Sequence, residues 1–142
     1  MERCYMQEHE GWLKIAKEDL QVAKTLLKAE FFSAVTYHCQ QSAEKALKGY
    51  LAFKKQEIAK THDLTKLVGV CKNFDCDFEK LYDAIEFLNP FATKFRYPTE
   101  FDVPEVADAE YAVKQAEYVF KFVLKKVVRD NMGQVNIFDI SE

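Results

Sequence analysis

Hydrophobic side chains in residues 31–55 recur at the spacing of an α-helix. The stretch holds no Pro and a single Gly, and it is long enough for about seven helical turns. At 3.6 residues per turn its side chains divide into two faces. The apolar face consists of Phe32, Val35, Cys39, Ala43, Ala46, Leu47, Tyr50 and Phe53. The pattern predicts a core helix against which the rest of the chain packs.

The opposite face of this predicted helix carries a row of polar residues at i, i+3, i+7 and i+10: His38, Gln41, Lys45 and Lys48. One imidazole and two ammonium groups on one face suit a phosphate-bearing ligand. Tyr37 beside them offers a ring that can stack on a base. The alternative is an ordinary solvated face, on which Glu44 and Lys48 form an i,i+4 ion pair.

A first helix is predicted over residues 11–30, joined to the core helix by a short connection around Glu30. Such short connections make antiparallel neighbours, so the two form an αα-hairpin. Asp19 lies inside the apolar stripe of the first helix. Either it is buried and needs a cation or several donors, or it reaches water at the helix edge. The stripe consists of Trp12, Ile15, Ala16, Leu20, Ala23, Leu26 and Leu27.

Two shorter helices are predicted next. The third follows a polar break and begins at Thr61 or Asp63, either of which can cap it, and it ends near residues 73–75. The fourth covers about 78–93, with its apolar residues facing inward. Pro90 sits late in it, so the alternative is a kink or an end near Leu88. The inward-facing residues are Leu81, Ile85 and Leu88.

Residues 94–104 form the longest predicted loop, and loops of this length in a helical domain tend to carry function. Arg96 and Tyr97 are its notable side chains. A structural alternative for Arg96 is an ion pair with a carboxylate such as Asp19.

A last long helix is predicted from about 105 to 129, with a continuous apolar stripe. Tyr111, Tyr118 and Phe122 extend its apolar surface beyond one face, which predicts an interface, most simply that of a two-fold homodimer. Gly133 is placed to close this helix, and the tail 131–142 is left without an assigned structure. The stripe consists of Ala109, Ala112, Val113, Ala116, Val119, Phe120, Val123, Leu124 and Val127.

Composition narrows the class of protein. The 142 residues predict one domain (1–142, core about 11–130), and only 4 Gly and 3 Pro favour an all-α fold. A net charge of −3 gives no general attraction to nucleic acid, so RNA binding requires a local basic patch. No apolar run is long enough to span a membrane and no signal-peptide pattern is present, so we expect a cytoplasmic protein. The four scattered cysteines predict buried thiols rather than disulfides.

Standard nucleotide-binding and hydrolase motifs are absent from the sequence. The three histidines, His9, His38 and His62, lack metal-type spacing, so we expect no metal site. Cys39 and His38 are adjacent on a helix and point about 100° apart, so they do not form a nucleophile–base pair.

Three segments resemble one known family: AVTYHCQQSAEKALKGYL (34–51), THDLTKL (61–67) and RYP (96–98). The chain resembles the HEPN domain, and residues 15–35, Asp19 included, are similar to the family's opening. The resemblance implies an up-and-down bundle of four to five helices, usually homodimeric. It also implies nucleotide binding and a minimal nucleotidyltransferase as partner, in toxin–antitoxin-like modules.

Many HEPN proteins are metal-independent ribonucleases that carry an Arg followed, after four to six residues, by a His. This chain departs from that pattern. The positions after Arg96 are Phe101, Asp102 and Val103, and those after Arg129 are Gln134, Val135 and Asn136. Arg3 and His9 have the spacing but precede the first predicted helix.

The interpretation is therefore a HEPN domain without catalytic residues of its own, with a nucleotide as candidate ligand. One alternative is a ribonuclease toxin in which Arg96 works with His38 or His62, with RNA as its substrate. Another is a purely structural interaction bundle. The phosphate-binding candidates are His38, Gln41, Lys45, Lys48, His62, Arg96 and Tyr97, with Asp19 as a buried polar partner.

Overall fold

The computed structural model describes residues 6–97 and 102–130, and all regular structure in these residues is helical. Three helices are long: α1 (Glu8–Lys28), α2 (Phe32–Phe53) and α5 (Val106–Asp130). Two are short, α3 (Leu64–Lys72) and α4 (Tyr82–Leu88), and two 3-10 helices flank α4, η1 (Cys76–Leu81) and η2 (Asn89–Ala92). The predicted all-α bundle is confirmed.

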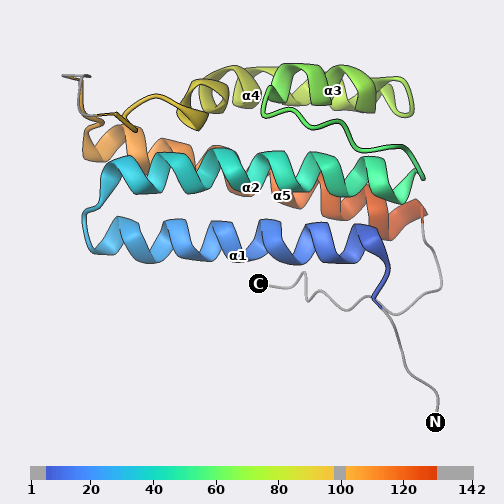
Figure 1. The fold of residues 1–142 in the computed structure, drawn as a ribbon, viewed down its shortest axis with the longest axis horizontal. Helices are drawn as coiled ribbons and strands as arrows, with labels where there is room; N and C mark the ends of the chain where they lie inside the picture. The colour runs from blue at the N-terminus through green and yellow to red at the C-terminus, as the bar shows by residue number, and fades with distance from the viewer. Residues whose placement is uncertain (1–5, 98–101, 131–142) are drawn as a thin grey trace, which may run out of the picture.

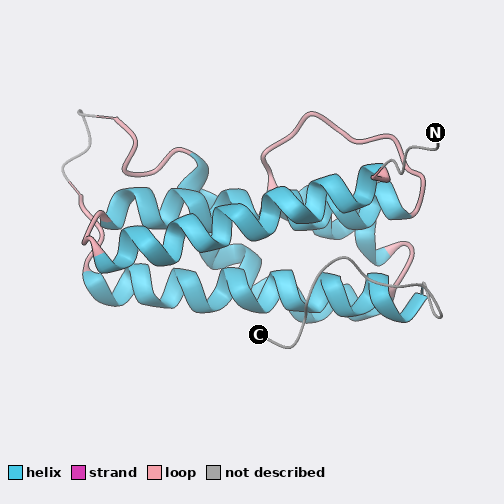
Figure 2. Cartoon of the chain, turned by 90° about the horizontal axis from the view of Figure 1, so that it is seen from below, coloured by secondary structure: helices cyan, strands magenta, loops and turns pink. Residues whose placement is uncertain are grey.

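Helix α2 lies at the centre of the bundle (Figure 1). It runs antiparallel to α1, α5 packs behind the pair, and α3 and α4 form a layer on the other side of α2. From below, the long helices lie along the same axis, with most connections at the two ends (Figure 2). The loop between α2 and α3 is different, because it returns alongside α2 before α3 begins (Figure 1).

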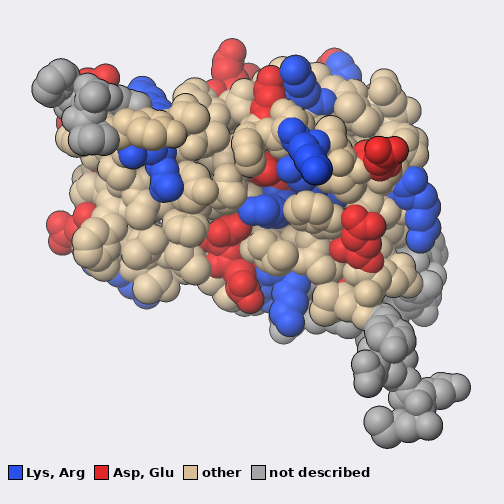
Figure 3. Space-filling view, in the orientation of Figure 1, with Lys and Arg blue, Asp and Glu red and all other residues tan. Residues whose placement is uncertain are grey.

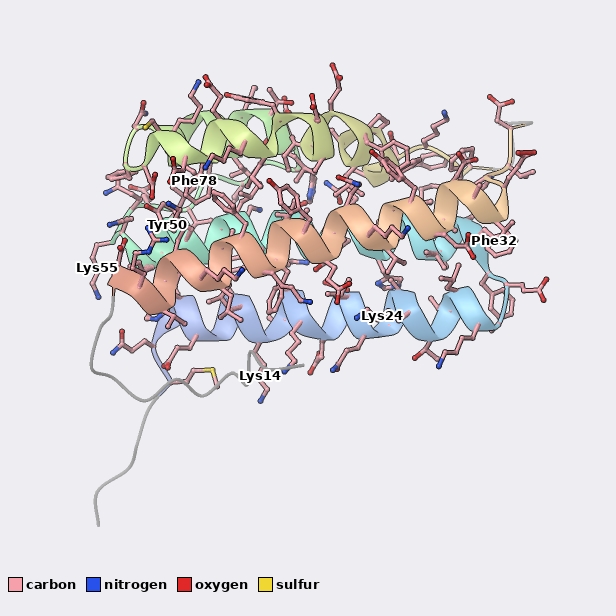
Figure 4. All side chains as sticks on the ribbon, turned by 180° about the vertical axis from the view of Figure 1, so that it is seen from behind. Lys14, Lys24, Phe32, Tyr50, Lys55 and Phe78 are labelled. Atoms are coloured by element: carbon pink, nitrogen blue, oxygen red, sulfur yellow. The ribbon has the colours of Figure 1, made fainter. Side chains whose placement is uncertain are left out.

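This position buries α2 on nearly all sides. Its predicted apolar face is confirmed from Val35 to Tyr50, and Tyr50 packs on Phe78 of η1 with ring centroids 4.4 Å apart (Figure 4). The polar residues of α2 are largely covered too, by α1 and by the α2–α3 loop. Ser42 Oγ, for example, donates to the Ala16 carbonyl of α1 at 2.8 Å. A helix with one solvated face is therefore not what the structure shows. The buried polar residues of α2 are Thr36, Gln40, Ser42, Glu44 and Lys48.

Most predicted helix ends are close to the observed ones. Asp63 caps α3, and its side chain accepts a hydrogen bond from the Thr65 amide at 3.0 Å. A single helix over 78–93 is not observed, because that stretch is divided among η1, α4 and η2. The alternative, an end near Leu88, is confirmed. Pro90 lies in the first turn of η2 and cannot donate to an α-helical ladder, so α4 ends at Leu88. Ile15 is exposed on α1 rather than buried.

Ion pairs tie α5 to the remainder of the bundle. Lys126 Nζ lies 2.8 Å from Asp75 Oδ2 and 2.7 Å from Asp77 Oδ2, at the start of η1. Lys24 of α1 pairs with Glu117 of α5 at 2.9 Å. None of the described helices has the length and apolarity needed to cross a membrane.

Of the cysteines, Cys39 and Cys71 are buried free thiols, as predicted, and Cys76 is exposed. Cys4, Gly133 and the tail 131–142 lie outside the described residues.

Candidate functional site

Asp19 contacts two of the predicted site residues, His38 and Lys45. His38 Nδ1 lies 3.0 Å from Asp19 Oδ1, and Lys45 Nζ lies 3.7 Å from Asp19 Oδ2. The Asp19 side chain is 17% exposed between α1 and α2, and the imidazole of His38 and the ammonium of Lys45 are its polar partners. Because a carboxylate can only accept, Nδ1 of His38 must carry the hydrogen. Nε2 is therefore the nitrogen that His38 can offer to a ligand.

Arg96 lies over an aromatic ring of α2. Its Cζ atom is 3.7 Å from the centroid of the Tyr37 ring, and that ring meets the imidazole of His38 edge-on, with centroids 5.3 Å apart. Within residues 6–97 and 102–130, the exposed guanidinium forms no ion pair. The alternative of a pair between Arg96 and Asp19 is therefore not observed, and Asp19 contacts His38 and Lys45 instead. We call Arg96, Tyr37, His38 and Asp19 together the Arg96 site.

A second cluster is built on Glu44, which is 2% exposed. Lys48 Nζ donates to Glu44 Oε2 at 2.9 Å, and His62 Nδ1 donates to Glu44 Oε1 at 2.9 Å. Burial raises the pKa of Glu44, but the hydrogen bonds from Lys48 and His62 outweigh it and leave that pKa below its ordinary value. The predicted i,i+4 pair is present, although it is buried rather than solvated. Lys48 is thus already neutralised inside the bundle.

Two glutamines join the clusters into one network along α2. Lys45 Nζ donates to Gln41 Oε1 at 3.1 Å, and Gln41 Nε2 donates to Gln40 Oε1 at 2.8 Å. Gln40 Nε2 in turn donates to the carbonyl of His62 at 3.1 Å. This last bond fastens the α2–α3 loop to α2. The His62 side chain itself remains 74% exposed beyond its bond to Glu44.

The structure divides the predicted site residues. His38 and Lys45 contact Asp19, and Gln41 joins this group through its hydrogen bond from Lys45. Lys48 and His62 contact Glu44. Arg96 joins the first group through Tyr37, and Tyr97 beside it is exposed. Gln40 and the central role of Glu44 were missed. The repeated amides at 40 and 41 were the available signal, but they do not show which side of the helix is buried.

The charge on the surface shown in Figure 3 is mixed. In the view of Figure 3, Lys and Arg side chains lie among acidic ones and do not form a patch of a single sign.

His9 belongs to the Arg3–His9 pair that has the ribonuclease spacing. It is buried against Phe53, with ring centroids 5.1 Å apart, and this burial lowers the pKa of His9. Arg3 lies outside the described residues. Among the residues that are described, no three His, Cys, Asp or Glu side chains gather closely enough to hold a metal ion.

Comparison with known proteins assigns the fold. Residues 9–127 match the HEPN domain. The chain belongs to the HEPN domain family, as the segments around 34–51, 61–67 and 96–98 predicted. A relative from Methanocaldococcus jannaschii, named "Putative toxin MJ1304", is 30% identical over 138 residues, which cover 86% of this chain and 89% of that protein.

Two solved structures are similar to the bundle. One is TT1696 from Thermus thermophilus, with a TM-score of 0.76 and 27% identity, covering 85% of this chain and 99% of that one. The other is ST0689, described as an archaeal HEPN homologue, with a TM-score of 0.70 and 26% identity, covering 87% and 100%.

Proposed function

We propose that this chain is a non-catalytic HEPN domain that binds a nucleotide at the Arg96 site and works with a nucleotidyltransferase partner in a toxin–antitoxin-like pair. The observation that carries the proposal is the exposed guanidinium of Arg96 over Tyr37, which no described carboxylate neutralises. The name of the Methanocaldococcus jannaschii relative supports the toxin–antitoxin setting.

The chemistry of the Arg96 site suits a nucleoside phosphate. A guanidinium can grip phosphate oxygens through two parallel hydrogen bonds, and it keeps its charge at any physiological pH. The exposed Tyr97 beside it adds an aromatic ring for a base. His38 adds Nε2, whose orientation is set by the bond from Nδ1 to Asp19.

The remaining candidates take secondary roles in this proposal. The ammonium of Lys45 lies 3.7 Å from the Asp19 carboxylate, which offsets part of the positive charge that Lys45 brings to the site. Lys48 is bound to Glu44 and its side chain is only 8% exposed, so it serves the fold. In this proposal Arg96 is the phosphate-binding group, and Tyr37 of α2 supports its guanidinium.

A thermal-shift titration tests the nucleotide part. ATP, GTP, CTP and UTP, with their mono- and diphosphates, are added with and without magnesium. A ligand that binds the folded state at 100 times its Kd stabilises it by about 2.7 kcal/mol, which raises the melting temperature. We expect Arg96→Ala to abolish the rise and Arg129→Ala to keep it. Arg129 is a matched control because α5 ends far from the Arg96 site (Figure 1).

A flat response of the wild-type protein across the whole panel would contradict nucleotide binding. Co-purification with the product of a neighbouring nucleotidyltransferase gene then tests the partner part separately. If neither a nucleotide nor a partner binds, the structural interaction bundle is the better description.

A second function, metal-independent RNA cleavage, is favoured by one observation. Arg96 and His38 both contact the Tyr37 ring, although the usual Arg-to-His spacing is missing. In that case His38 Nε2 takes the proton of the 2′-hydroxyl, and the 2′-oxygen attacks the adjacent phosphorus while the bond to the 5′-oxygen breaks. The 5′-oxygen takes a proton from water, the product is a 2′,3′-cyclic phosphate, and Arg96 stabilises the charge on the phosphate. Cleavage measured with a chelator present should then disappear in both Arg96→Ala and His38→Ala. Cleavage that survives Arg96→Ala would rule this function out.

A further inference from the structure

Three non-glycine residues in the described chain have a left-handed backbone: Glu30 (φ 67°), Lys55 (φ 60°) and Phe95 (φ 68°). Glu30 and Lys55 follow the ends of α1 and α2 and have exposed side chains, as is common where a helix ends. Phe95 is different, because it is a partly buried aromatic residue in the loop that carries Arg96. Bulky residues rarely adopt this conformation, and glycine adopts it without steric cost.

The geometry around Phe95 is a tight turn. The Arg96 amide donates to the Thr93 carbonyl at 3.1 Å, which makes Phe95 the third residue of a four-residue turn. A positive φ at this position favours Gly or Asn. The Lys94 amide donates to the Pro90 carbonyl at 2.9 Å and closes the turn before it.

The Phe95 ring is held by a series of aromatic contacts that starts on α5. Tyr111 of α5 meets Phe87 of α4 with centroids 4.7 Å apart, and Phe87 meets Phe91 of η2 at 5.3 Å. Phe91 stacks on Phe95 at 5.8 Å with an interplanar angle of 23°. Phe91 is itself buried. The loop is thus anchored to the bundle immediately before Arg96.

We propose that Phe95 is a positioning residue that holds the guanidinium of Arg96 over Tyr37. Two successive side chains contact different elements: Phe95 stacks on Phe91 of η2, and Arg96 lies over Tyr37 of α2. Fixing both side chains places the guanidinium before a ligand arrives, which removes part of the ordering cost of binding. A glycine would relieve the backbone at position 95 but would remove the ring that stacks on Phe91. The role in binding rests on the proposed function, whereas the positioning of Arg96 does not.

The positioning can be measured by NMR without a ligand. Protons of the Arg96 side chain over the Tyr37 ring should resonate upfield of those of Arg129. We expect this ring-current shift to be retained in Phe95→Tyr, which keeps the stacking ring, and to be lost in Phe95→Gly. Lys55→Gly is the matched control, because it introduces glycine at another left-handed position, and it should keep the shift. An unchanged Arg96 signal in a folded Phe95→Gly protein would overturn the inference.

Binding supplies the second readout, with the nucleoside triphosphates ATP, GTP, CTP and UTP as probes. Loss of a pre-ordered arginine should weaken binding about two- to tenfold in Phe95→Gly. If Phe95 acts through Arg96, Phe95→Gly should cause no further loss in an Arg96→Ala background. Additional weakening in that background would refute a role through Arg96. If the wild-type protein binds none of the probes, the proposed function fails, and the ring-current measurement still decides the role of Phe95.

Discussion

Replacing Glu44 by Gln should destabilise the fold, because it breaks a buried ion pair from one side. The carboxylate is 2% exposed and accepts hydrogen bonds from Lys48 and His62, both at 2.9 Å. Gln keeps the size of the side chain but leaves the Lys48 ammonium without its counter-charge in a site where water has little access. Breaking a buried ion pair on one side costs about 3–5 kcal/mol, and we expect the lower end because the exposed side of His62 can rehydrate.

Urea unfolding followed by circular dichroism measures this loss. With an m-value of about 2 kcal/mol/M, a loss of roughly 3 kcal/mol lowers the midpoint by about 1.5 M. The control is Glu79→Gln, because Glu79 pairs with Lys72 at 3.3 Å with a side chain that is 72% exposed. Surface pairs of this kind contribute about 0–1 kcal/mol, so the control midpoint should hardly move.

A double variant separates charge from packing at this position. Glu44→Gln combined with Lys48→Met removes both charges and should recover most of the lost stability, because no unpaired ammonium remains. The reasoning would be refuted if Glu44→Gln alone cost under about 1 kcal/mol. That result would mean that Lys48 keeps its hydration in the folded protein.

The Glu44 contribution should also depend on pH. Because the folded-state pKa of Glu44 lies below the ordinary value of 4.5, the unfolded chain takes up the proton first as the pH falls. The stabilisation is therefore complete above the ordinary pKa and is lost as the pH falls from there through the folded-state pKa. The difference in stability between the wild-type protein and Glu44→Gln should shrink over that range. A difference that stays constant between pH 6 and the acid transition would contradict this assignment.

Two further predictions concern packing and thiols. Gly49→Ala should lower the free energy of unfolding by about 1 kcal/mol, because its new Cβ would lie 3.1 Å from a side-chain carbon of the buried Leu13 of α1. Gly69→Ala is the control and should stabilise α3 by about 0.5–1 kcal/mol, because a Cβ there would meet nothing within 4 Å. Equal effects of the two variants in urea unfolding would contradict a tight contact at Gly49. Burial raises the pKa of the Cys39 and Cys71 thiols to about 12. Iodoacetamide at pH 8 should therefore label only Cys76 among these three thiols in the folded protein. Early labelling of Cys39 or Cys71, detected by mass spectrometry, would contradict this prediction.

Local patterns in the sequence predicted most of the fold. Apolar periodicity located the long helices and the buried side of α2, and the capping preference of Asp63 located the start of α3. These features depend on residues within a few positions of one another. Pro90 indicated the end near Leu88, but the sequence pattern did not show the division of 76–92 into η1, α4 and η2, because that division depends on how the segment packs on α2 and α5.

The sequence by itself determined the family and the residues that carry polar chemistry, including the row on α2 and the loop arginine. Only the tertiary structure decided which of these residues meet. In the tertiary structure Glu44 and Lys48 form a buried pair, Asp19 contacts His38 and Lys45, and the guanidinium of Arg96 lies over the ring of Tyr37. Periodicity describes one helix at a time, whereas the burial of a charged group and the path of a loop depend on every element packed around them. For that reason Lys48 is left to the buried pair with Glu44, and the proposed site lies at the His38 end of the row, where Arg96 contacts Tyr37.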